Sequence, residues 1–259
     1  MTLALLRIQL YSHPLTVRRH DGGVTTRTTS LTVLLPPSEG KAPDGVDPGW
    51  SPDRGTFGEA LAERRDEVVD ALAAAGGGNQ KLLGVGGAHL ERAMQSNRVL
   101  LGAPTLPAWR RYTGVVWDHL DPATLTAAQR RSIVVVSGLH GLARADDPVP
   151  DYRLKMGASL PPMGKLSTWW RPVLGPALAS VTRRRTVVDL LPQEHRAAFT
   201  EDDREQFVVI ELVERSGAPG GHAAKAAKGR LARHLLTSGL PLDQALATWT
   251  DERFSAVGT

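Results

Sequence analysis

A run of four β-branched residues, Ile133-Val134-Val135-Val136, constrains the fold of this chain most strongly. β-branched side chains favour strands, and a short apolar run bounded by polar residues is typical of a buried strand. Ser137 and Gly138 follow directly, and small residues let the backbone turn tightly. The run therefore predicts a central buried strand, with the segment after it held at the end of that strand.

That segment, residues 137–157 (SGLHGLARADDPVPDYRLKMG), carries a dense set of charges. Pro148 and Pro150 forbid a regular helix and favour an extended, stiff loop. Loops on rigid scaffolds are where binding and catalytic groups concentrate, so we expect a functional site here. A solvated, charged connection with nothing bound is the alternative. The candidate residues are Ser137, Gly138, His140, Arg144, Asp147, Tyr152 and Arg153.

Other parts of the chain show clear strand or helix patterns. Apolar and β-branched runs predict strands at 31–35, 186–191 and 207–213. Helices are predicted at 57–75, 166–181 and 223–236, with Pro172 and Pro176 expected to break the second of them or start turns there. Residues 1–30 have no clear period and are predicted to be a flexible extension, with an extra strand allowed at 3–10.

Composition narrows the classes of function. The chain has no cysteine, which excludes disulfides, thiolate metal sites and a cysteine nucleophile and fits a reducing, cytoplasmic compartment. No apolar run approaches the length of a membrane span, so we expect no membrane partner. The net charge of +4 permits a polyanionic partner without requiring one. The histidines form no HExxH motif, and we predict neither a metal site nor a cofactor.

The strand at 31–35 runs into the segment PPSEGKAPDG, residues 36–45. Ser38, Glu39 and Lys41 supply a hydroxyl, a carboxylate and an ammonium just beyond a buried strand, which are suitable groups for a ligand site. The segment is not a P-loop, because GxxxxGK[ST] is absent. A phosphate contact here would depend on Lys41 as a point charge. The plainer interpretation is a polar turn with a local ion pair.

Residues 82–94 resemble a helix–hairpin–helix element. Gly84 and Gly86 would let the hairpin backbone lie against a phosphate, and the following helix would present unpaired amide groups. Such an element grips the sugar–phosphate backbone without reading bases. The alternative is a tight turn between two core helices. A dinucleotide GxGxxG motif is disfavoured, since His89 stands in place of the third glycine.

Four further residues, Lys225, Lys228, Tyr112 and Gly229, are candidates on weaker grounds, and His195 is not chosen as one. Lys225 and Lys228 lie three apart on one face of the helix at 223–236, which could equally be a solvated face. Tyr112 could stack on bases or belong to the core. Gly229 costs about 1 kcal/mol relative to alanine inside a helix, and a close approach by another element or a ligand would explain it. His195 is more often a surface or satisfied histidine than a general base.

Five segments occur in the order seen in the YaaA family of peroxide-stress proteins: LLPPSEGK at 34–41, YTG at 112–114, residues 137–157, VVDLLPQEH at 187–195 and AAKGRLARHLL at 226–236. The resemblance covers roughly residues 31–257. It implies one compact α+β domain, residues 31–259, with a mixed β-sheet flanked by helices. It also implies resistance to hydrogen peroxide by limiting intracellular iron and oxidative DNA damage, and DNA binding through a basic cleft with a helix–hairpin–helix-like element.

The resemblance also implies a set of site residues on four segments. These are Ser38, Glu39, Lys41, Tyr112, Gly114, Ser137, Gly138, Arg144, Asp147, Tyr152, Arg153, Lys225, Lys228 and Gly229. The chain departs from the family pattern where Ala145 replaces a frequent proline and where His140 and His195 replace frequent tyrosines.

Two functions stay open at this point. One is a monomeric protein that binds the DNA backbone without sequence specificity and protects against oxidative damage. The other is an enzyme acting on a small anionic or nucleotide-like molecule, with Arg144 and Arg153 holding the anion. Its catalytic candidates are Lys41, Glu39, Ser38, Tyr152 and Lys225. Both hypotheses expect Lys41, Arg144, Arg153 and Lys228 to share one basic hollow. A scaffold without either activity is a third possibility.

Overall fold

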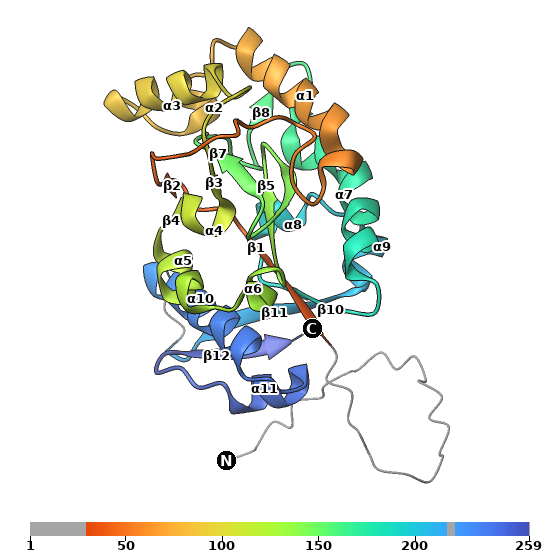
Figure 1. Ribbon diagram of the computed structural model, residues 1–259. Helices are drawn as coiled ribbons and strands as arrows, with labels where there is room; N and C mark the ends of the chain where they lie inside the picture. The colour runs from red at the N-terminus through yellow and green to blue at the C-terminus, as the bar shows by residue number, and fades with distance from the viewer. Residues whose placement is uncertain (1–29, 217–220, 259) are drawn as a thin grey trace.

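The computed structural model describes residues 30–216 and 221–258. Its centre is a six-stranded mixed sheet with the order β12-β11-β10-β1-β5-β6 (Figure 1). The strands are β1 (Leu31–Leu35), β5 (Ile133–Ser137), β6 (Gly141–Arg144), β10 (Thr186–Asp189), β11 (Phe207–Glu214) and β12 (Phe254–Gly258). The four inner strands run parallel, and β6 and β12 are antiparallel at the two edges. The mixed sheet and the strands expected at 31–35, 133–136, 186–191 and 207–213 are thus confirmed.

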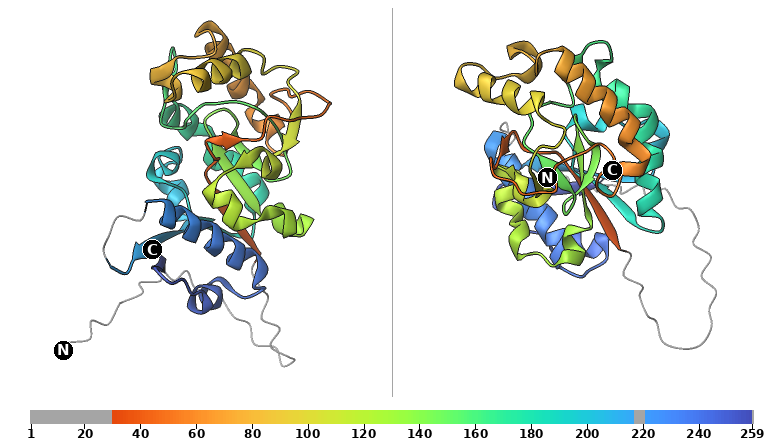
Figure 2. Two further views of the ribbon diagram at one scale, coloured as in Figure 1. Left: turned by 90° about the vertical axis from the view of Figure 1, so that its left-hand side faces the viewer. Right: turned by 45° about the horizontal axis from the view of Figure 1, so that its top comes forward.

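Helices cover both faces of this sheet (Figures 1 and 2). α5 (Val115–Leu120) and α10 (Gly221–Thr237) pack together on one side, and α7 (Leu166–Thr182) lies on the other. α1 (Gly58–Ala74), α2 (Gln80–Leu83) and α3 (Ala88–Arg98) lie beyond the carboxyl ends of the parallel strands. Parallel strands covered on both faces need continuous apolar runs, and the side chains of 133–136 are accordingly buried.

Short elements complete the connections. The helices are α4 (Ala108–Arg111), α6 (Ala127–Arg130), α8 (Gln193–Arg196), α9 (Glu201–Glu205), α11 (Leu242–Thr248) and the 3₁₀ turn η1 (Pro122–Thr124). The strands are β2 (Gly40–Lys41), β3 (Thr105–Pro107), β4 (Tyr112–Thr113), β7 (Pro148–Pro150), β8 (Ser159–Leu160) and β9 (Gly164–Lys165). None of the helices in the described part of the chain has both the length and the apolarity that a bilayer crossing needs. The arm expected at 1–30 lies, apart from Ser30, outside the described residues.

Two expectations about regular structure are wrong. Pro172 and Pro176 lie inside α7 instead of interrupting it, because Trp170, Leu174 and Leu178 share a buried helical face whose packing outweighs the lost backbone bonds. The segment 137–157 is not a loop throughout, because it contains β6 and β7, but the extended structure expected at Pro148 and Pro150 is present as β7. Its tight turn places Gly141 at φ 65°, where a Cβ atom would lie 2.9 Å from the Trp170 ring.

Gly229 marks the contact between α10 and α5. A Cβ atom at this position would lie 2.3 Å from the Val116 carbonyl oxygen and 3.1 Å from the Leu120 amide nitrogen. These atoms are backbone, so they move only if one helix moves. Of the two explanations for a glycine here, the close approach of another element is therefore the one observed.

Gly229→Ala should lower the free energy of unfolding by about 1–3 kcal/mol, although alanine alone favours a helix by about 1 kcal/mol. The loss follows because α10 must move away from α5. Urea unfolding measures it, with Gly86→Ala as a matched control. A Cβ atom at Gly86 meets its nearest neighbour at 3.5 Å, an ordinary contact. Equal stability of Gly229→Ala and wild type would contradict the packing described.

Candidate functional site

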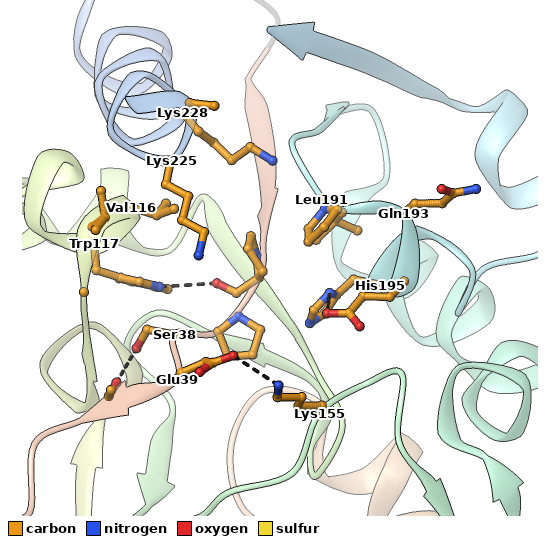
Figure 3. A pocket seen from close by; sticks show the side chains of 18 of the residues that line it. Ser38, Glu39, Val116, Trp117, Lys155, Leu191, Gln193, His195, Lys225 and Lys228 are labelled. Carbon is orange, nitrogen blue, oxygen red and sulfur yellow. Dashed lines mark hydrogen bonds and ion pairs between the residues drawn. The ribbon is translucent and has the colours of Figure 1, made fainter. Parts of the chain in front are cut away.

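A cavity of about 1130 Å³ opens beside the carboxyl ends of the parallel strands (Figure 3). Its walls are the segments that follow β1 (36–41), β4 (113–117) and β10 (191–196), together with 153–155, 210–212 and the first turns of α10. In open α/β sheets, ligands bind at the carboxyl ends of the strands. The fold therefore places a candidate site where the sequence predicted its polar loops.

Lysine is scarce in this chain but concentrated at the cavity. Only six of the 31 lysines and arginines are lysine, and four of these six line the cavity: Lys41, Lys155, Lys225 and Lys228. Arginine stays charged in proteins, whereas a shielded lysine can release its proton. The cavity is thus lined by lysine, the basic side chain that can exist as a neutral amine.

Lys41 lies half-buried at the end of β2. Its Nζ atom donates to the Ser38 carbonyl at 3.0 Å and lies 4.2 Å from the centre of the Tyr152 ring and 5.5 Å from that of Tyr112. Among the residues the structure describes, no carboxylate forms an ion pair with it. Burial lowers the pKa of Lys41 to about 7, although the charge of Asp151 opposes this shift. Lys41 is therefore partly unprotonated at neutral pH.

Beneath Lys41 lies a hydroxyl cluster formed by Ser137, Tyr112 and Tyr152. The Tyr152 hydroxyl is 2.7 Å from Ser137 Oγ and 3.0 Å from the Tyr112 hydroxyl, and all three side chains are buried. Burial raises the pKa of Tyr152 to about 12 and that of Tyr112 well above its usual value. The hydroxyls therefore keep their protons at neutral pH, and the cluster fixes the two rings that support Lys41.

Glu39 forms ion pairs with two other basic side chains, those of Arg153 and Lys155. Its carboxylate accepts from Arg153 at 3.0 Å and lies 3.3 Å from Lys155. Burial raises the pKa of Glu39, but the bonds and charges of Arg153 and Lys155 outweigh it and lower the pKa overall. Arg153 also donates to the Leu83 carbonyl at 3.0 Å. Arg153 is thus committed to structural partners, contrary to its expected role in holding an anion.

The far end of the cavity is formed by α8 and α10. Lys228 donates to the Leu190 carbonyl, and burial lowers its pKa to about 8 despite the nearby charge of Asp189. Asp189 is fully buried and accepts from Arg196 at 2.6 Å. Lys225 points into the cavity (Figure 3) and has no side-chain partner among residues 30–216 and 221–258. Lys225 is therefore the cation available to an incoming anion.

Glu194 was not predicted to be a site residue, and His195 was expected to be a surface or satisfied histidine more often than a general base. Both line the cavity, and His195 Nδ1 is 3.6 Å from Glu194 Oε1. That nitrogen is buried and has no hydrogen-bond partner among the described residues. A Cβ atom at Gly157 would lie 2.6 Å from Glu194 Oε2, so the small residue leaves room for this carboxylate. The available signal was a carboxylate in the segment that follows the strand predicted at 186–191.

His195 should make the protein sensitive to acid. Burial, helped by the charge of Lys228, lowers its pKa from 6.5 to about 4. Between these values the unfolded chain binds a proton that the folded protein does not bind, so stability falls as the pH falls from about 6.5 to about 4. We expect His195 to contribute up to about 3 kcal/mol of this loss.

Urea unfolding of wild type and His195→Gln at pH 7 and pH 4.5 measures that contribution. The difference between the two proteins should grow in favour of the variant at the lower pH. His89→Gln, which changes an exposed histidine, serves as control and should follow wild type. An unchanged pH dependence in His195→Gln would mean that the ring is protonated at little cost.

The predicted site residues fall into three groups. Those that line the cavity are Ser38, Glu39, Lys41, Gly114, Arg153, Lys225 and Lys228. Those that lie behind its wall are Tyr112, Ser137, Gly138, His140 and Tyr152. Those placed elsewhere are Gly84, Gly86, Arg144, Asp147 and Gly229. The structure thus brings residues 38–41, 113–114 and 153 together with Lys225 and Lys228 of α10 around one cavity.

Arg144 does not share the hollow with Lys41, Arg153 and Lys228. β6 returns antiparallel to β5 and pairs Arg144 with Val134, so the side chain lies toward the amino end of β5, away from the cavity. Asp147 accepts from the Thr56 hydroxyl at 2.7 Å and from the Arg144 amide at 2.7 Å. Asp147 therefore has a structural role, because it links the loop before α1 to the turn after β6.

The hairpin expected at Gly84 and Gly86 is an exposed turn between α2 and α3. α2 has 4 residues, ends at Gly84 with φ 65°, and α3 begins after Gly87. The first helix of the expected element is thus a single turn. Nowhere in the described part of the chain do three or more histidine, aspartate or glutamate side chains gather to hold a metal ion.

Comparison with known proteins places this architecture in a family. The sequence profile of the family described as peroxide stress protein YaaA matches residues 31–257. A UPF0246 protein of Streptomyces coelicolor is 35% identical over 219 residues, which cover 81% of this chain and 84% of the relative. A UPF0246 protein of Corynebacterium efficiens is 33% identical over 217 residues, covering 80% and 86%. The chain therefore belongs to the YaaA family of peroxide stress proteins.

Proposed function

We propose that the cavity binds a small anionic molecule and that Lys41 is the group that reacts with it. The observation that carries this proposal is a lysine with a pKa of about 7, without a carboxylate partner among the described residues, in the wall of a cavity of ligand size. Catalytic bases and nucleophiles need a pKa near the working pH, and burial is the usual way to lower that of lysine.

The charges around Lys41 support an anionic ligand. Arg153 and Lys155 are paired with Glu39. Among the described residues, Lys225 has no partner and Lys228 is bound only by the Leu190 carbonyl. Two cations that lack carboxylate partners at one end of a cavity attract anions and repel cations. The peroxide-stress role of the family would then depend on the ligand of this cavity.

A thermal-shift screen of nucleotides, amino acids and other small carboxylates at low salt tests the proposal. A ligand at about 100 times its Kd stabilises the folded protein by about 2.7 kcal/mol, a rise in Tm of several degrees for a chain of this size. Lys225→Ala should reduce this shift, because it removes the free cation. Lys165→Ala, outside the cavity, is the control. A flat screen, or shifts that survive Lys225→Ala unchanged, would count against the proposal.

DNA binding is a second candidate. We propose it on the exposed turn at 84–87, where Gly87 has φ 57° and a Cβ atom would meet nothing within 4 Å. Lys155 Nζ lies against Gly84, and a backbone could approach the amide groups at the start of α3. Fluorescence anisotropy of a labelled duplex at increasing salt is the test. Lys81→Ala should reduce the salt slope by about one, and undetectable binding at low salt would exclude this candidate.

A further inference from the structure

The surroundings of Lys41 orient its lone pair. A neutral amine has two N–H groups and one lone pair, and the lone pair is repelled by other electron-rich groups. The Ser38 carbonyl at 3.0 Å and the face of the Tyr152 ring at 4.2 Å are both electron-rich, so each accepts one N–H group. Lys41 is one of the residues that line the cavity. With both N–H groups directed to these acceptors, the lone pair is the part of the amine left to face a ligand there.

We propose that Lys41 is a nucleophilic amine that forms an imine with the aldehyde or ketone carbonyl of a small anionic ligand. This inference rests on the proposed function and narrows its ligand class. A general base needs only an accessible lone pair, but a nucleophile also needs space for the carbonyl carbon and its substituents. The cavity that Lys41 lines, about 1130 Å³, provides that space. Lysine amines activated by a dry pocket or by neighbouring cations react with carbonyls in this way.

The chemical step is balanced without a further reactant. The lone pair of Lys41 Nζ bonds to the carbonyl carbon, and the π electron pair of the carbonyl moves to its oxygen, which takes up a proton. The nitrogen loses a proton, the hydroxyl group is protonated and leaves as water, and a carbon–nitrogen double bond forms. The nitrogen then releases its second proton to give the neutral imine. The net change is amine plus carbonyl to imine plus water, so no oxidant or reductant is required.

Lys225 and Lys228 point to an anionic carbonyl compound. Both lie on α10 across the cavity from Glu39 (Figure 3), and Lys225 has no partner among the described residues. A carboxylate or phosphate held there would keep a carbonyl of the same ligand in the cavity that Lys41 faces. The expected class is therefore a small molecule with an aldehyde or ketone and an acidic group, such as a 2-oxo acid.

Glyoxylate with cyanoborohydride at pH 7 provides the test, because the reductant traps an imine as a stable adduct that peptide mass spectrometry locates. The chain has only six lysines, so each can be followed. We expect the adduct at Lys41 to exceed that at the exposed Lys81 or Lys165 at least about tenfold, because lysine attacks a carbonyl only as the neutral amine. Lys225→Ala should weaken the labelling of Lys41 several-fold, and Lys165→Ala should not.

Lys41→Arg keeps the positive charge and should remove the adduct at this position while other lysines stay as before. Similar labelling of all lysines in wild type would overturn the imine. If a ligand from the thermal-shift screen still depends on Lys225, the binding proposal survives that result. If the screen is flat and Lys41 is not labelled selectively, both proposals fail. Selective labelling of Lys41 supports the imine whatever the screen yields.

Discussion

Lys41→Met is expected to stabilise the folded protein by about 1–3 kcal/mol at pH 7 and below. The pKa of Lys41 is about 7 in the folded protein and near 10.5 in the unfolded chain. Between these values the unfolded chain holds a proton that the folded protein has released, so wild-type stability rises from pH 7 to about 10.5. Below pH 7 the folded protein carries the full cost of a shielded ammonium, a few kcal/mol. Methionine removes this cost but gives up the bond to Ser38 and the ring contacts.

Urea unfolding of Lys41→Met and wild type at pH 6.5 and pH 10 measures the effect. The stabilisation should be largest at pH 6.5 and should shrink toward pH 10. Lys165→Met, at an exposed lysine, is the matched control and should show little change at either pH. A loss of stability in Lys41→Met at pH 6.5 would show that the ammonium is well solvated. A functional residue that costs stability is a common compromise at active sites.

Arg65→Met should destabilise the protein by about 3–5 kcal/mol, the largest loss we expect from one substitution. Arg65 is 1% exposed, and burial lowers its pKa to about 10, so it stays charged at neutral pH. It donates to four carbonyl oxygens, at distances of 2.8 to 3.0 Å: those of Pro52, Arg54, His140 and Leu142. Methionine fills similar space but leaves these buried oxygens without donors.

The same substitution should disturb the cavity wall. His140 follows the turn at Ser137, whose hydroxyl accepts from the amides of Leu139 and His140 and contacts Tyr152. Loosening this turn should therefore reduce the selective reactivity of Lys41. Arg131→Met, at an exposed arginine, is the matched control for unfolding. An Arg65→Met protein within about 0.5 kcal/mol of wild type would mean that water replaces the lost donors.

The elements that could be predicted from the sequence are those with a strong local pattern. β1, β5, β10 and β11 are β-branched runs, and α1, α7 and α10 have apolar residues at helical spacing. β6 and β12 were missed, because their sequences GLAR and FSAVG are short and lack such a pattern. They are strands because a neighbouring strand pairs with them. Gly141 and the Trp170 ring illustrate this long-range control, which no local window contains.

For the candidate site, the sequence indicated which types of residue are present more than how they are arranged in space. The segments that carry Lys41, Arg153 and Lys228 could be placed together, because each follows or faces the carboxyl end of a strand. Arg144 could not be placed, since its position depends on the antiparallel return of β6. The ion pair between Arg153 and Glu39 could not be predicted from the sequence either, because the two residues are 114 positions apart. Charge in a loop indicates polarity, but only the fold decides which charges are already paired.

The account depends on Lys41 being an amine with a near-neutral pKa, and its titration tests this most directly. Trace labelling with acetic anhydride from pH 6 to pH 11, followed by peptide mass spectrometry, gives the reactivity of each of the six lysines as a function of pH. We predict a midpoint of about 7 for Lys41. The exposed Lys165 serves as the internal reference. A Lys41 midpoint that coincides with that of Lys165 would contradict the account.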